Sequence, residues 1–158
     1  MGRRSVLAGV AVFVVVVAIA TGPLVGVDAT RKPVTQFGEG TATVEGVTTD
    51  TTAFRVTDGR FGTGVAYVRV PTATVRVSAV EDRPRLLYLV SVPALGVELT
   101  ASTVVTTPGS YRLAPDDRGL ARDAPDASSY SGRLTVRVQS FEADRTVYDR
   151  NLTVEVAA

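Results

Sequence analysis

From residue 40 to the C-terminus, apolar and polar residues alternate along most of the chain. The alternation is clearest over residues 72–79, where the odd positions are apolar and the even positions are polar. Successive side chains of a β-strand point to opposite faces, so this two-residue period predicts a strand with one face in a core and the other in solvent. The chain beyond residue 40 is therefore expected to consist of half-buried strands.

The same period predicts about eight strands in all. Besides residues 72–79, they are 41–47, 52–56, 65–70, 86–92, 95–102, 133–139 and 151–156. The run 86–92 is apolar at both odd and even positions, which predicts a central strand covered on both sides. The last two runs are close enough to form a hairpin through residues 142–145. No amphipathic helix is expected after residue 40.

These strands predict an all-β domain made of two antiparallel sheets packed face to face, an immunoglobulin-like β-sandwich. Each sheet has one apolar face, and the two faces bury each other in this architecture. A partly open barrel is the alternative. Valine and threonine are abundant, and their branched Cβ atoms suit a pleated sheet better than a helix, which supports the all-β class.

A long apolar segment precedes this domain. Residues 5–27 carry no charge and follow Arg3 and Arg4. At about 1.5 Å per residue, a helix over 5–27 would reach about 34 Å, enough to cross a hydrocarbon core of about 30 Å. The two arginines favour a cytoplasmic N-terminus and place the rest of the chain outside the membrane. The predicted order is a cytoplasmic N-terminus (1–4), a transmembrane or signal helix (5–27), a stalk (28–38) and an exported domain (39–158).

Three fates remain open for residues 5–27. A retained transmembrane anchor is favoured, a cleaved export signal is the second interpretation, and a buried helix of a soluble protein is the third. Residues 18–20 (Ala-Ile-Ala) have the small-x-small form of a signal-peptidase site, and residues 27–29 form a looser one. Residues 3–7 are similar to a twin-arginine export signal, although Gly2 stands where serine or threonine is usual. The first two fates both place the domain outside.

The composition removes several classes of function. Cysteine and histidine are both absent, which excludes disulfide bonds, Ser-His-Asp and Cys-His catalysis and most zinc sites. The 17 basic residues nearly balance the 16 acidic ones, which gives no net field to attract a nucleic acid. We therefore expect no catalytic residue, no cofactor and no nucleic-acid partner. A hydrolase that works on carboxylates alone is the weaker alternative.

The strand pattern is interrupted over residues 114–131, a polar stretch that is long for a loop in a compact domain. Its carboxylates could bind calcium through oxygen atoms, and they belong to Asp116, Asp117, Asp123 and Asp126. They lack the alternate spacing and central glycine of an EF-hand loop, and two arginines lie among them. A solvated acidic loop is therefore favoured over a metal site, and no metal ligand is assigned.

Two short motifs carry candidate chemistry. The glycines between Gly59 and Gly64 precede a predicted strand instead of a helix, so a hairpin is favoured over a phosphate-binding loop. Asn151, the only asparagine of the chain, begins an Asn-Leu-Thr sequon in a predicted strand. Its parity matches that of Thr153 and Glu155, which places it on the solvent face and makes it a candidate for N-glycosylation.

The chain uses arginine almost to the exclusion of lysine, with Lys32 the single lysine. Together with the arginine-led apolar segment and the Val/Thr-rich domain, this usage resembles small membrane-anchored or secreted envelope proteins of haloarchaea. Residues 59–71 are the stretch best suited to identifying relatives. The near balance of charges departs from the strongly acidic haloarchaeal pattern and leaves an origin in a GC-rich actinobacterium open. The resemblance implies no catalytic activity.

These observations predict a single-pass protein of the cytoplasmic membrane whose C-terminal domain lies outside the cell. Secretion after signal cleavage is the alternative location. The expected role is structural, through contacts with other envelope proteins at open sheet edges and at residues 114–131. The alternative function is an exported module that binds a ligand or calcium.

Overall fold

The computed structural model describes residues 38–59 and 64–157. These residues belong to one compact unit, which spans Thr35–Ala158. The predicted membrane segment (5–27) and all but the last residue of the predicted stalk (28–38) lie outside the described residues. No helix within the described ranges is long and apolar enough to cross a bilayer.

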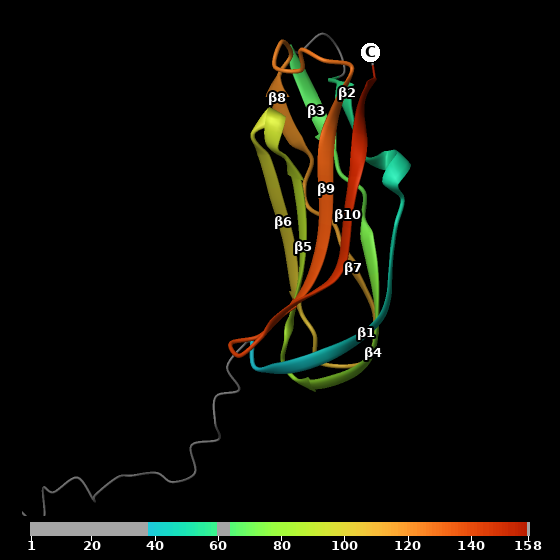
Figure 1. The fold of residues 1–158 in the computed structure, drawn as a ribbon, viewed down its shortest axis with the longest axis vertical. Helices are drawn as coiled ribbons and strands as arrows, with labels where there is room; N and C mark the ends of the chain where they lie inside the picture. The colour runs from blue at the N-terminus through green and yellow to red at the C-terminus, as the bar shows by residue number, and fades with distance from the viewer. Residues whose placement is uncertain (1–37, 60–63, 158) are drawn as a thin grey trace, which may run out of the picture. The chain divides into compact units, whose positions relative to one another are not determined.

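The described residues form ten β-strands and two short 3-10 helices (Figure 1). The strands are β1 (Gly40–Thr49), β2 (Arg55–Asp58), β3 (Val65–Arg69), β4 (Ala73–Asp82), β5 (Arg85–Val92), β6 (Val97–Val104), β7 (Gly109–Leu113), β8 (Arg118–Ala121), β9 (Ser129–Gln139) and β10 (Asp144–Ala157). The 3-10 helices are η1 (Thr51–Ala53) and η3 (Pro93–Leu95). The predicted all-β class is confirmed. Each of the eight predicted runs overlaps a strand, and β7 and β8 are additional.

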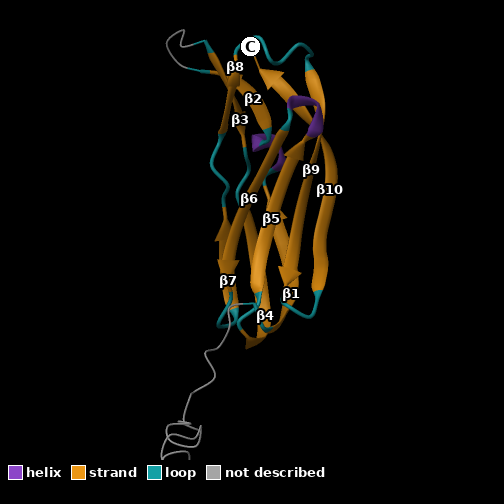
Figure 2. Cartoon of the chain, turned by 90° about the vertical axis from the view of Figure 1, so that its left-hand side faces the viewer, coloured by secondary structure: helices purple, strands orange, loops and turns teal. Residues whose placement is uncertain are grey.

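The strands form two sheets. The smaller sheet has the order β1-β4-β7, and the larger has the order β6-β5-β9-β10-β2-β3-β8. Neighbouring strands are antiparallel, which confirms the prediction, except that β10 runs parallel to β2 over three residue pairs, Glu155 to Ala157. Because β1 belongs to the smaller sheet and β2 to the larger, the chain passes from one sheet to the other between these two strands. Figure 2 shows β6, β5, β9 and β10 side by side in one layer.

One hydrophobic core is shared by the two sheets. The smaller sheet contributes Val75 and Val77 of β4, and the larger contributes Leu86 of β5 and Leu134 and Val136 of β9. The two-residue alternation predicts the inward direction of the residues from β4 and β9, whereas the run that contains Leu86 does not alternate. No polar or charged residue is buried among the described residues. Because burial of one valine or leucine side chain stabilises a fold by about 1.5–3 kcal/mol, apolar packing is the main source of stability here.

Two β-bulges shift the alternation in the smaller sheet. Glu45 of β1 and Ser78 of β4 have no partner across the β1–β4 ladder. An extra residue moves the two-residue period by one position. Ala42 therefore faces the core before the bulge in β1, and Val47 and Thr49 lie inward after it.

Strand β5 lies between β6 and β9 but is covered on one side only within the described part of the chain. Its even positions are buried from Leu86 to Val92, whereas Leu87 and Leu89 are half-buried. The prediction of a strand covered on both sides is therefore wrong. The smaller sheet covers the face that carries Leu86, and no second layer of described residues covers the opposite face.

The prediction of a loop over residues 114–131 is also partly wrong. This stretch contains β8, which pairs with β3 from Arg118 opposite Val68 to Ala121 opposite Val65. A four-residue strand at a sheet edge places few side chains in the core, and here only Leu120 is partly buried. The sequence pattern was too short to indicate it.

Candidate functional site

Asp117, one of the predicted acidic-loop residues, holds that loop against β3. Its carboxylate accepts hydrogen bonds from the Arg69 guanidinium and from the backbone N–H of Val70, the latter at 3.1 Å. The Arg69 guanidinium also lies 5.2 Å from the centre of the Tyr67 ring, within the range of a cation–π interaction. Asp117 therefore has a role inside the fold, as the partner of an arginine.

Asp126 closes a turn in the same loop. Its carboxylate accepts a hydrogen bond of 2.9 Å from the Tyr130 hydroxyl. That hydroxyl in turn accepts hydrogen bonds from the backbone N–H groups of Asp126 at 2.7 Å and Ala127 at 3.0 Å. Asp116 and Asp123 are exposed. Within the described residues no three acidic side chains are placed to hold a metal ion together.

Two arginine–aspartate pairs join β9 and β10 on the outer face of the larger sheet. Arg133 binds Asp149 and Arg137 binds Asp144, each through Nε and Nη2, with both Nε–Oδ1 distances at 2.8 Å. The hydrogen bond from Arg133 lowers the pKa of Asp149, and the same hydrogen bond raises the pKa of Arg133. Arg133 and Arg137 lie on the same face of β9, and each of the two guanidinium groups is paired with a carboxylate.

A shallow groove lies on the same outer face. Its lining comes from β6, β5, β9 and β10 and includes Glu98, Leu89, Arg133 and Thr146. The lining combines two aliphatic residues, Leu89 and Val90, with charges of both signs and is open to solvent. Small-molecule sites are usually enclosed and mostly apolar, whereas protein interfaces mix apolar and charged groups on open surfaces, so the groove suits contact with a protein better.

The side of β10 away from β9 is unpaired over residues 148–154, which we call the open edge. β10 pairs with β2 only from Glu155 to Ala157, and no other described strand pairs with this side. Val156 donates its N–H to the Ser128 carbonyl in the β9–β10 ladder. Hydrogen-bonded pairs alternate along an antiparallel ladder, so Thr153 directs its backbone N–H toward the open edge. An unpaired strand edge is a template for a strand of another chain.

Asn151 lies in the middle of the open edge. Its side chain is exposed, in agreement with the solvent face predicted for it. Thr153 is also exposed and lies two residues further on, so both sequon side chains lie on the same face of the strand. The structure therefore leaves room for a glycan at this position.

No known protein family, curated protein or solved structure matches the chain. Sequence reasoning assigned no role to Tyr130 or Phe141, which the structure singles out. Tyr130 follows a Pro-Asp turn at the start of a strand, and this position could have indicated that its hydroxyl binds the turn. Phe141 is a lone aromatic residue between Ser140 and Glu142 in the hairpin turn, and an apolar residue there is unusual enough to be noticed.

Proposed function

We propose that this chain is a non-catalytic protein of the cell envelope, held by a single N-terminal membrane segment with its β-domain outside. Residues 5–27 and the two preceding arginines support the anchor and its orientation. The arginine usage, the apolar segment and the Val/Thr-rich domain resemble those of haloarchaeal envelope proteins, which agrees with this location. Release after signal cleavage is the alternative, and it leaves the domain in the same compartment.

We infer further that the domain is an immunoglobulin-like sandwich. Tyr130, at the start of β9, binds the backbone of Asp126 and Ala127 through its hydroxyl, and this is the geometry of the tyrosine corner found in such domains. The strands fall into two separate sheets, and the two outermost strands of the larger sheet, β6 and β8, do not pair with each other, which supports the sandwich over the alternative of a partly open barrel.

The observation that carries the proposed role is the open edge of β10. A long strand with one unpaired side is normally blunted, covered or paired with a partner, because its backbone groups otherwise attract other strands. We propose that another envelope protein adds a strand there, with main-chain hydrogen bonds giving affinity and side-chain pockets giving specificity. The outer-face groove around Leu89 would widen that contact.

The test uses a proline that removes one outward backbone donor. In Thr153→Pro the N–H directed toward the open edge is lost, whereas the hydrogen bonds of the ladder with β9 are kept. Thr153→Ala is the matched control, because it loses the hydroxyl and the sequon but keeps the backbone N–H. Full-length chains are crosslinked in their native membranes, and the crosslinked product is sized after mild detergent extraction.

We expect one defined product from the unchanged chain and from Thr153→Ala, and a loss of that product from Thr153→Pro at an unchanged melting temperature. A product that survives the proline, or a chain that elutes alone before any substitution, would contradict the proposal.

The alternative of a calcium-binding module has its own test. Thermal melting is compared with and without millimolar calcium, and a ligand that binds only the folded chain raises the melting temperature. We expect no shift, because Asp117 and Asp126 are engaged by Arg69 and Tyr130. A rise in melting temperature that Asp116→Asn or Asp123→Asn removes would favour the alternative.

A further inference from the structure

The described chain begins at Gly38, where three separate segments meet. The Gly38 N–H donates a hydrogen bond of 2.9 Å to the Arg83 carbonyl, and the Gly38 carbonyl accepts one of 2.6 Å from the Phe141 N–H. The Arg83 N–H donates to the Glu39 carbonyl at 3.0 Å. Arg83 connects β4 to β5, and Phe141 lies in the turn between β9 and β10. Residues 1–37 are therefore covalently joined to the domain beside the β9–β10 turn, and Figure 1 shows this turn next to the start of β1.

Phe141 is the single large hydrophobic side chain that is exposed among the described residues, with 70% of its surface accessible. Its ring lies over Gly38, since a Cβ atom built on that glycine would be 3.5 Å from the Phe141 Cε2 atom. Most of the ring faces solvent all the same. Residues at the tip of a turn are ordinarily polar, and the exposed part of the Phe141 ring does not contribute to the hydrophobic core.

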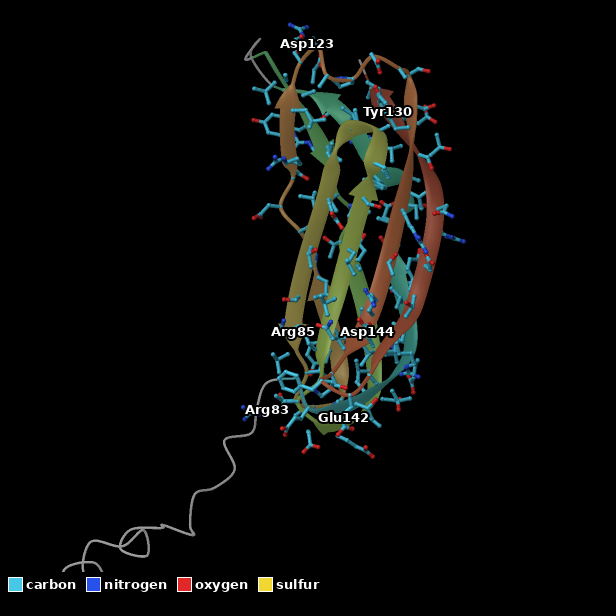
Figure 3. The ribbon with its side chains drawn as sticks, turned by 60° about the vertical axis from the view of Figure 1, so that its left-hand side comes forward. Arg83, Arg85, Asp123, Tyr130, Glu142 and Asp144 are labelled. Carbon is cyan, nitrogen blue, oxygen red and sulfur yellow. The ribbon has the colours of Figure 1, made fainter. Side chains whose placement is uncertain are left out.

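Charges of both signs surround Phe141. One adjoining hollow is lined by Arg85, Gln139 and Ser140, and another is lined by Glu39, Glu81, Asp82 and Glu142, among other residues. Figure 3 shows Arg83, Arg85, Glu142 and Asp144 at this end of the domain and Asp123 at the opposite end. Carboxylates outnumber arginines in these two linings, which disfavours an anionic surface and leaves zwitterionic lipid head groups as the compatible lipid.

We propose that this end of the domain rests on the outer surface of the membrane, with the Phe141 ring inserted into the head-group layer as a second point of attachment. The inference relies on the proposed anchor at residues 5–27. The chain between residues 27 and 38 spans at most about 40 Å when fully extended, so Gly38 and the adjacent Phe141 are held within reach of the bilayer surface. Attachment through the anchor makes the second contact intramolecular, and even one aromatic side chain then has a high effective concentration at the lipid surface.

The experiment exploits the absence of tryptophan from the chain. Phe141→Trp gives a full-length protein with a single tryptophan at the β9–β10 turn, and Asp123→Trp gives one at the opposite end of the domain as the matched control. Both are reconstituted into phosphatidylcholine vesicles with and without a brominated phosphatidylcholine, which quenches tryptophan that touches lipid. Flotation of the vesicles reports separately whether the chain is anchored.

We expect both variants to float with the vesicles. Only the tryptophan at position 141 should be quenched by the brominated lipid, and it should emit at a shorter wavelength than a tryptophan exposed to water. If both variants float and position 141 emits as a residue in water, the proposed anchor stands and this inference is overturned. Equal quenching at positions 141 and 123 would overturn it as well, because the whole domain would then contact lipid. If the chains do not float, the proposed anchor fails, and the inference fails with it.

Discussion

The Tyr130 hydroxyl accepts a hydrogen bond of 2.7 Å from the backbone N–H of Asp126 and returns one of 2.9 Å to the Asp126 carboxylate. It also accepts a hydrogen bond from Ala127. One side chain on β9 thus satisfies two backbone donors of the turn that precedes this strand.

Tyr130→Phe should destabilise the domain. The substitution removes only the hydroxyl, so the ring stays packed while the N–H groups of Asp126 and Ala127 lose their acceptor. Leaving partly buried donors unsatisfied costs about 1–3 kcal/mol, and we expect a loss in that range in the free energy of unfolding measured with urea. An unchanged unfolding midpoint would mean that water replaces the hydroxyl without cost.

Tyr88→Phe is expected to have the opposite outcome. The Tyr88 hydroxyl on β5 and the Thr49 hydroxyl on β1 are both buried, and neither has a hydrogen-bond partner of normal geometry. Replacing a buried, unsatisfied hydroxyl by hydrogen removes a desolvation cost. The free energy of unfolding should stay the same or rise by up to about 1 kcal/mol, in the same urea titration that serves for Tyr130→Phe. A clear loss would show that the hydroxyl has a partner, such as Thr49.

The same tyrosine gives the protein an alkaline dependence of stability. Burial raises the pKa of Tyr88 from 10.0 to about 12, and the nearby Thr49 hydroxyl offsets part of that rise. The unfolded chain therefore loses its Tyr88 proton first as the pH rises. The contribution to stability is fully present below pH 10 and is lost between about pH 10 and pH 12. Tyr88→Phe should make the decline in that window shallower than in the unchanged chain.

Gly40→Ala should be strongly destabilising, whereas Gly46→Ala in the same strand should not. Gly40 has a φ of +84°, and a Cβ atom there would lie 2.0 Å from the Glu81 carbonyl oxygen, in the backbone of the neighbouring strand. A Cβ atom on Gly46 has no atom within 4 Å. We expect Gly40→Ala to cost more than about 2 kcal/mol and Gly46→Ala to remain within about 1 kcal/mol, as measured by urea unfolding. Equal effects of the two substitutions would contradict this account of the start of β1.

Asn151 is expected to carry a glycan in the native host. The side chain is exposed on β10, and the sequon reads Asn-Leu-Thr. Intact mass of the chain purified from its own membranes should exceed the mass of the polypeptide, and Asn151→Gln and Thr153→Ala should remove the excess equally. The same measurement reports whether the N-terminal segment is cut. A mass equal to that of the bare polypeptide would exclude the modification.

The direction of most side chains in the domain could be predicted without coordinates. Val75, Leu134 and Val154 are inward because a strand alternates its faces and water excludes apolar groups, and both effects are local in sequence. The exposure of Asn151 follows from the same rule. The bulges are an exception, because Glu45 and Ser78 are displaced by pairing between two strands and not by their own neighbours in sequence.

The sequence by itself determined the all-β class, the uncharged apolar run over residues 5–27 and most residues of the core, since each follows from a pattern that one segment carries alone. Only the tertiary structure decided which strands pair, and therefore that β10 runs beside β2 for three residues and is open before them. It also decided that Leu87, Leu89 and Phe141 stay accessible. Pairing joins segments far apart in the chain, and the choice among competing partners depends on the packing of the whole domain.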